Sequence, residues 1–290
     1  MEKTWKILDL LNTTTDYLKQ KSIENARLNA ELLLADVLNI ERLHLYVEFE
    51  RPVAEKELSA YRSRISRRVR REPLQYILGR TEFMGLPFYV DSSVLIPRPE
   101  TEILCEEVLK LQNKNGQIST LLDIGTGSGC IAVSLAHLWP GLQVTAIDYS
   151  TEALETAKKN ALLNKVDNIT FLQQNIFQTG QGSQLEKAFS IIVSNPPYIS
   201  KDEMKGLQKE VADFEPRIAL TDEADGMQFY THILKMLSSQ SLKCDYCFLE
   251  MSGSFPEKIV KTAELSGFSD LNVIKDLNGI DRVLKIKTSH

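Results

Sequence analysis

An asparagine, two prolines and a tyrosine, Asn195-Pro196-Pro197-Tyr198, follow an apolar run in the second half of the chain. Residues 190–194 before them are rich in β-branched side chains and apolar on both faces, which is typical of a central parallel strand. Neither proline can donate a ladder hydrogen bond, so the strand must end there. Because ligands bind at the carboxyl ends of strands in open α/β sheets, these four residues are candidates for a binding site.

A second candidate is the glycine-rich segment LLDIGTGSGC, residues 121–130, between an expected strand and an expected helix. Glycines there allow backbone amides and the helix N-terminus to approach a ligand closely. The spacing G-x-G-x-G differs from the G-x-G-x-x-G that seats a dinucleotide pyrophosphate, which disfavours a nicotinamide or flavin enzyme. Taken alone, the segment is equally compatible with an ordinary tight turn. We assign to cofactor binding Gly125, Thr126, Gly127, Ser128 and Gly129.

The next expected strand ends in Asp148, 19 residues beyond Gly129. An acid at this place can accept both hydroxyls of a ribose. The alternative role is an N-cap for the following helix, but Ser150 and Thr151 can cap that helix themselves, so we favour cofactor binding.

The third expected strand is followed by Asn175, Ile176 and Phe177, which we expect along the same rim, against the edge and face of an adenine. A glycine loop and a ribose acid without a demanding pyrophosphate site indicate a nucleoside-bearing cofactor, and S-adenosylmethionine fits that description. Here the sequence resembles a class I methyltransferase, and N-P-P-Y resembles the signature of enzymes that methylate a planar nitrogen.

The chemistry of such a nitrogen explains the four residues. Its lone pair is delocalised, so an enzyme must hold the group with the lone pair aimed at the methyl donor. We expect the Asn195 side-chain oxygen and the Pro196 carbonyl to accept the two N–H protons and to compensate positive charge that develops on nitrogen. Pro197 stiffens the loop, and Tyr198 offers a face to a planar group. We predict Asn195, Pro196 and Tyr198 as catalytic, all four residues as substrate-binding, and Asn195 also as a cofactor contact.

Composition favours a globular enzyme that is not a bulk nucleic-acid binder. The 290 residues are 43% hydrophobic and carry a formal net charge of −5. Residues 1–90 hold 15 basic and 13 acidic side chains, and the remainder holds 19 and 26, whereas a protein that binds bulk nucleic acid is usually more basic. Four sparse cysteines, no leader and no 18-residue apolar run predict a reduced, cytoplasmic, non-membrane protein.

Three regions of different periodicity divide the chain. Residues 1–80 show only helical spacing, and the helix expected over 54–71 carries an arginine row, which we interpret as a solvated face in preference to a docking surface: Arg64, Arg67, Arg68 and Arg71. Residues 81–98 alternate like a hairpin and form a structured linker. Helices and apolar strands then alternate over 99–290, which predicts a doubly wound, mostly parallel α/β sheet. The short turn at 277–279 predicts an antiparallel strand at or near the sheet edge.

Motifs along the whole chain resemble those of the protein-(glutamine-N5) methyltransferases that modify peptide chain release factors. The motifs are EPLQYILG (72–79), EFMGLPFYV (82–90), LIPRPETE (95–102), DIGTGSGC (123–130), NPPYI (195–199), FEPRIAL (214–220), DG (225–226) and KDLNGIDRVL (275–284). The resemblance implies a seven-stranded class I methyltransferase sheet, a small N-terminal all-helical substrate-recognition domain, S-adenosyl-L-methionine as cofactor and class I release factors as protein substrate. It implies methylation of the glutamine in a Gly-Gly-Gln motif, with N-P-P-Y holding the glutamine amide and with the glycine loop and Asp148 holding the cofactor. We expect a monomer that binds no nucleic acid directly.

Some positions depart from this pattern or stay open. The family usually has an aspartate where Asn175 stands, and its usual glutamine is absent after Glu250. Arg98 and Glu100 either line the cofactor or substrate mouth or form an ion pair at a helix start. Cys244 and Cys247 have C-x-x-C spacing, but no second pair completes a zinc site, so we predict no metal. Two other functions compete: an adenine-N6 or guanine-N2 methyltransferase acting on nucleic acid, and a binding module that uses the nucleoside pocket as a sensor.

Overall fold

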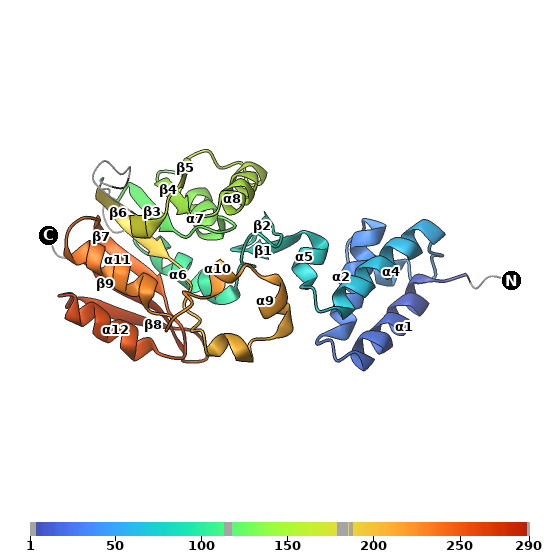
Figure 1. The fold of residues 1–290 in the computed structure, drawn as a ribbon. Coiled ribbons are helices and arrows are strands. Elements are labelled where there is room, and N and C mark those ends of the chain that lie inside the picture. Colours follow the sequence, from blue (N-terminus) through green and yellow to red (C-terminus); the bar gives the residue numbers. More distant parts are fainter. Residues whose placement is uncertain (1–3, 113–117, 179–184, 186–187, 289–290) are drawn as a thin grey trace. The chain divides into compact units, whose positions relative to one another are not determined.

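The computed structural model describes residues 4–112, 118–178, 185 and 188–288. The chain divides into two compact units, Met1–Gly79 with Lys209–Phe214 and Arg80–Gln208 with Glu215–His290 (Figure 1). Within the described ranges, no helix combines the length and the apolar character needed to cross a bilayer.

The first unit is helical, as its periodicity predicts. Its helices are α1 (Ile7–Gln20), α2 (Ala26–Leu38), α3 (His44–Val47), α4 (Glu55–Val69), α5 (Leu74–Leu78) and α9 (Lys209–Phe214). The apolar stripes of α1, α2 and α4 meet in one core, in which Tyr61 is fully buried and donates its hydroxyl proton to the Ala30 carbonyl at 3.0 Å. That α9, more than 130 residues further along the chain, belongs to this unit could not be predicted from local sequence patterns.

The second unit is built on the predicted mostly parallel sheet of seven strands, in the order β5-β4-β3-β6-β7-β9-β8. The strands are β3 (Thr120–Ile124), β4 (Gln143–Asp148), β5 (Ile169–Gln173), β6 (Ala188–Ser194), β7 (Lys243–Glu250), β8 (Leu271–Lys275) and β9 (Asp281–Lys287). Strand β9 runs antiparallel to both neighbours, next to the edge strand β8, which confirms the prediction from the short turn at 277–279. The order reverses between β3 and β6, so a crevice opens at their carboxyl ends.

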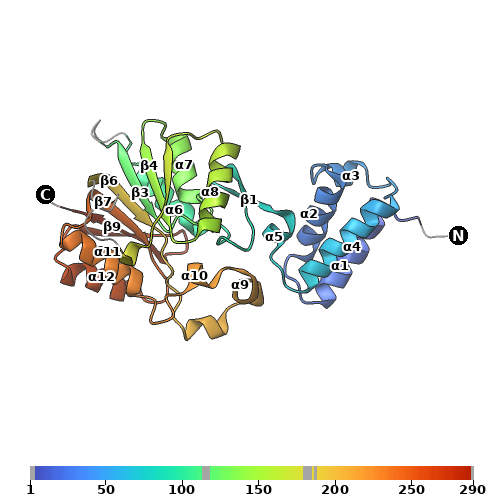
Figure 2. The same cartoon turned by 45° about the horizontal axis from the view of Figure 1, so that its top comes forward.

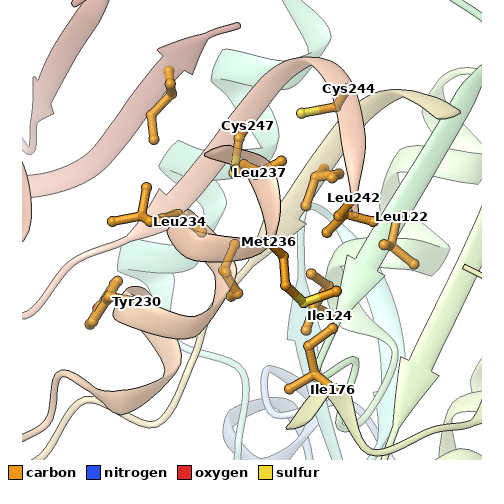
Figure 3. Close-up of a cluster of buried hydrophobic side chains, with 14 of the residues drawn as sticks. Leu122, Ile124, Ile176, Tyr230, Leu234, Met236, Leu237, Leu242, Cys244 and Cys247 are labelled. Atoms are coloured by element: carbon orange, nitrogen blue, oxygen red, sulfur yellow. The ribbon is translucent and has the colours of Figure 1, made fainter. Parts of the chain in front are cut away.

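Helices cover both faces of this sheet (Figure 2). On one face lie α6 (Pro99–Leu109), α7 (Cys130–Leu138) and α8 (Thr151–Leu163), and on the other lie α11 (Gln228–Ser238) and α12 (Pro256–Leu265). Successive side chains of β3 point to opposite faces of the sheet. Leu121 packs in the core with α7, and Leu122 packs in the core with α11. Cys244 and Cys247 are buried thiols in the core between the sheet and helices α11 and α12, among leucine and methionine side chains (Figure 3).

The segment that the sequence marks as a linker is packed into the second unit. Strands β1 (Arg80–Phe83) and β2 (Leu86–Tyr89) form the predicted hairpin, and Phe83 and Phe88 are buried in the core under α6 and α7. The buried amide of Asn160 on α8 bonds both backbone groups of Tyr89, at 2.7 and 3.0 Å. Three short elements complete the described unit: η1 (Ile176–Gln178), η2 (Glu203–Gly206) and α10 (Arg217–Leu220).

Candidate active site

A cavity of about 260 Å³ opens at the carboxyl ends of β3, β4 and β6, where the strand order reverses. Most of the residues predicted from the sequence line it: Gly125, Thr126, Gly127, Ser128, Asp148, Asn175, Ile176, Phe177, Asn195, Pro196 and Pro197. Gly129 and Tyr198 are not among its lining residues. The walls also include residues that follow β2 and that begin α6, among them Val94, Pro97 and Thr101. Stretches that are far apart in sequence thus meet in one pocket.

The glycine loop and Asp148 are joined by backbone hydrogen bonds. The Asp148 carboxylate accepts the N–H of Gly127 at 2.8 Å on one oxygen and the N–H of Ser150 at 2.9 Å on the other. Burial raises the pKa of Asp148, and these N–H donors act in the opposite direction. The Ser150 hydroxyl caps α8 by accepting the Ala153 N–H at 3.1 Å, so the helix does not depend on Asp148 for its cap.

Gly129 acts through packing. It has φ of +79°, and a Cβ at this position would lie 3.0 Å from the Ala157 Cβ on α8. Only glycine fits this close approach without a shift of one helix against the other. Its absence from the cavity wall follows from this place between α7 and α8.

The rim after β5 presents one amide and one aromatic ring. Asn175 Oδ1 accepts the Phe177 N–H at 2.9 Å. The two Nδ2 protons of the amide can then donate to a ligand. Ile176 lines the cavity and also belongs to the hydrophobic core next to it (Figure 3). The Phe177 ring is 42% exposed and packs edge-on against Phe229 of α11, with centroids 4.8 Å apart. Phe229 also lines the cavity. Helix α11 was not predicted from the sequence, although the helical spacing of Tyr230, Ile233, Leu234 and Leu237 is a signal that could have found it.

The N-P-P-Y loop is held from two sides. Asn195 Nδ2 donates to Thr101 Oγ1 of α6 at 3.2 Å. On the other side, Gly226 packs against the Tyr198 carbonyl so closely that a Cβ would fall 2.2 Å from that oxygen. The Ile199 N–H also bonds the Leu220 carbonyl at 2.9 Å. The FEPRIAL and DG motifs therefore shape the loop that carries Asn195.

Arg98 does form an ion pair, but with a residue distant in sequence. Its guanidinium contacts the Glu215 carboxylate at 2.5 Å, while Glu100 faces Arg282 at 3.9 Å. Glu215 is buried, and burial raises its pKa against the opposing effect of Arg98. The pair links the IPRP and FEPR motifs, and Arg98 also lines the cavity, so both proposed roles meet in one residue.

The arginine row of the helical unit is engaged within that unit. Arg64 contacts Asp36 at 2.6 Å, and Arg67 contacts Glu72 at 2.5 Å. Arg68 and Arg71 both face Glu210 of α9, at 3.2 and 3.4 Å. The row is neither fully solvated nor free for docking, because each guanidinium already has a carboxylate partner.

The cavity suits a nucleoside cofactor that lacks phosphate. Its charged lining residues are Asp148 and Arg98, and Arg98 is already neutralised by Glu215, so the lining offers no unpaired cation for a phosphate. The Asp148 oxygens keep lone pairs for two hydroxyls, and the buried Asp123 Oδ1 behind the loop has no hydrogen-bond partner among the described residues. These hydrogen-bond acceptors, in a cavity without a free cation among its described lining residues, fit S-adenosylmethionine. Together with the strand order, they define a class I methyltransferase domain.

Comparison with known proteins gives the family. The PrmC N-terminal domain model matches residues 9–79, and the methyltransferase small domain model matches residues 100–212. Release factor glutamine methyltransferase from Geobacter sulfurreducens is 41% identical over 97% of this chain and 96% of its own length. The enzyme of the same name from Chlorobaculum tepidum is 40% identical over 98% and 97%. The chain belongs to the release factor glutamine methyltransferase family.

A solved structure supports the fold. The hMettl16 catalytic domain, in complex with MAT2A 3′UTR hairpin 6, aligns with a TM-score of 0.57 at 20% identity, over 78% of this chain and 82% of that one. At this identity the likeness concerns the α/β sheet and its helices.

Proposed function

We propose that this chain transfers a methyl group from S-adenosylmethionine to the side-chain amide nitrogen of the glutamine in the Gly-Gly-Gln motif of class I peptide chain release factors. The observation that carries the proposal is a single cavity that joins Asn195 and Pro196 to the glycine loop and Asp148, in a chain with full-length relatives of that name.

The cofactor residues act by hydrogen bonding and exclusion of water. S-adenosylmethionine supplies an electrophilic methyl group when it is bound. The Asp148 carboxylate accepts the ribose hydroxyls, and the backbone of residues 125–128 forms the floor of the pocket. Ile176 and Phe177 pack on the adenine, and the Asn175 amide offers protons to a ring nitrogen, where the usual aspartate of the family can only accept.

The residues at the end of β6 handle the substrate amide. Asn195 Oδ1 and the Pro196 carbonyl oxygen accept its two N–H protons, which aims the lone pair and stabilises positive charge as it develops on nitrogen. Pro197 restricts the loop, and Tyr198 packs against the planar group from outside the cofactor cavity. No strong base is required, since the methylated nitrogen can release its proton to water.

The partner is a protein, and a glutamine side chain offers few contacts of its own. Binding energy from elsewhere on the release factor must therefore select this glutamine. We assign that role to an N-terminal helical domain, residues 1–80, followed by a linker at 81–98 and the methyltransferase domain at 99–290. The enzyme is a cytoplasmic monomer with no direct nucleic-acid partner.

The test compares protein with nucleic acid. The enzyme is incubated with S-adenosylmethionine labelled in the methyl group, together with either a purified release factor or total RNA and DNA. Label in the release factor alone supports the proposal. Label in nucleic acid, with none in the protein, would establish the competing base methyltransferase instead.

A further inference from the structure

Glu250 is a buried acid with no part in the roles assigned so far. It is the last residue of β7, one position beyond Leu249, which pairs with Ser194, so it lies beside Asn195 in the parallel register. Glu250 is only 2% exposed, and within the described part of the chain its Oε2 has no hydrogen-bond partner. Burying a carboxylate with one oxygen unsatisfied costs folding free energy, so Glu250 needs an explanation other than packing, such as a role in the reaction.

Thr101 connects this acid to the N-P-P-Y loop. It lies on α6, is 1% exposed and lines the cavity. Its Oγ1 accepts a hydrogen bond from Asn195 Nδ2 at 3.2 Å, and its hydroxyl acts as a nearby hydrogen-bond donor that lowers the pKa of the Glu250 carboxyl. A hydroxyl has one proton, so while it accepts from Asn195 it can donate only to Glu250. The carboxylate thus fixes the donor and the acceptor in each bond: Asn195 donates to Thr101, and Thr101 donates to Glu250.

The direction matters at the other end, where the substrate binds. With Nδ2 committed to Thr101, the Asn195 amide presents Oδ1 as its free acceptor. A glutamine amide nitrogen brings N–H donors, which need acceptors. If the Asn195 amide were turned over, its NH₂ group would face the substrate NH₂ group, and donors would oppose donors.

The surroundings of Glu250 leave its charge sensitive to pH. Burial raises the pKa of Glu250 to about 7, the Thr101 hydroxyl and Arg282 act to lower it, and Glu100 acts to raise it. The other titratable groups near it are Arg98, Cys105, Cys130, Tyr198 and Tyr230. The two thiols and two phenols have raised pKa values themselves, so they stay neutral near pH 7.

We propose that Glu250 is a positioning residue for methyl transfer, whose carboxylate accepts a hydrogen bond from the Thr101 hydroxyl and thereby holds Asn195 with Oδ1 toward the substrate amide. The inference rests on the proposed function, because it needs an amide substrate at Asn195. When Glu250 is protonated, its own O–H can donate to Thr101, and the two orientations of the Asn195 amide become similar in energy. The rate of transfer therefore falls as the pH drops through about 7.

The test combines Glu250→Gln with two substitutions of Thr101. Glu250→Gln keeps the shape but does not titrate, so we expect kcat to fall at least tenfold at pH 8, since misplaced groups cost up to about a hundredfold. The KM for S-adenosylmethionine should stay within about twofold, and the rise of kcat through pH 7 should disappear. Thr101→Val should behave in the same way, whereas Thr101→Ser keeps the hydroxyl and should restore most of the rate.

Tyr230→Phe is the matched control. The Tyr230 hydroxyl donates to the Glu250 backbone carbonyl at 2.7 Å, so this change removes a contact to the same residue without touching its carboxylate. We expect its pH profile to match that of the unmodified chain. A second readout needs no activity: the thermal midpoint of the unmodified chain should fall between pH 5 and 7.5 more steeply than that of Glu250→Gln.

Two results would overturn the inference. One is a folded Glu250→Gln variant with unchanged kcat and an unchanged rise through pH 7. The other is a Thr101→Val variant as active as Thr101→Ser. Failure of the unmodified enzyme to methylate any release factor is a separate result, which would contradict the proposed function as well.

Discussion

The two halves of the active site are built in different ways. In the cofactor half, neighbouring loops hold one another through backbone hydrogen bonds, as between Gly127 and Asp148. In the transfer half, Asn195 donates to the side chain of Thr101 on α6, and we infer that Glu250 at the end of β7 fixes the direction of that bond. The first half depends on turn geometry that a short sequence motif encodes. The second depends on a fold that brings distant side chains together.

The comparison predicts that the transfer half can be broken while the cofactor half stays intact. Asn195→Ala removes an acceptor that acts on charge developing at nitrogen, so turnover should fall by about two to three orders of magnitude. Most of the affinity for S-adenosylmethionine should remain, as measured by calorimetry. Near-normal turnover at saturating substrate would show that another group holds the amide.

Each half contains a buried acid whose pKa is raised to about 7, and both acids should make the free energy of unfolding depend on pH. Burial raises the pKa of Asp123, from 3.8 to about 7, and that of Glu250, from 4.5 to about 7. Between about pH 4 and 7 the folded chain retains protons that the unfolded chain has released, so raising the pH through this window lowers the free energy of unfolding. For Asp123 the loss across the whole window is on the order of 4 kcal/mol.

Asp123→Asn should therefore be less sensitive to pH than the unmodified chain. Urea unfolding at pH 5.5 and 7.5 measures the difference, and the part that remains in Asp123→Asn comes from the other acids whose pKa burial raises, Glu250, Asp148 and Glu215. A free energy of unfolding that rises between these two pH values would contradict burial of both acids in neutral form.

The cofactor half can be weakened separately. Asp148→Ala removes the carboxylate proposed to hold the ribose hydroxyls, and binding of S-adenosylmethionine should weaken by about 1.5–3 kcal/mol, the usual range for hydrogen bonds to a charged group. Calorimetry on the folded variant measures this change. Unchanged affinity would place the ribose elsewhere.

The smallest expected effect concerns Asn175. Asn175→Asp restores the residue usual in the family, keeps the acceptor used by the Phe177 N–H and removes the amide protons. We expect a change in cofactor affinity of about 1 kcal/mol or less, because one neutral hydrogen bond is exchanged for another. A larger loss would mean that the Asn175 protons are an essential adenine contact.

The same comparison explains what the sequence could predict. Strands such as β4 and β6 were predictable because each is a short apolar run closed by a polar or proline residue. The lining role of Gly127 and Asp148 followed from their spacing along two successive strand ends. Helix α11 and its Phe229 were not predicted, because the DG motif before the helix carries no information about which of its side chains faces the cavity.

The contacts of Thr101 with Asn195 and of Glu215 with Arg98 could not be predicted from the spacing of residues in the sequence. Thr101 lies 94 residues from Asn195, and Glu215 lies 117 residues from Arg98. Only the folded sheet and its crossing helices bring such pairs into contact. The same applies to Glu210, which reaches the arginine row from α9, 142 residues after Arg68.

Mass spectrometry of the release factor tip tests the central claim most directly. A purified release factor is incubated with the enzyme and S-adenosylmethionine, digested, and compared with a factor whose Gly-Gly-Gln glutamine is changed to alanine. We predict a single added methyl group on that glutamine and none on the changed factor. Absence of the methyl group from the glutamine, with an enzyme that binds S-adenosylmethionine and is active on another substrate, would contradict the account.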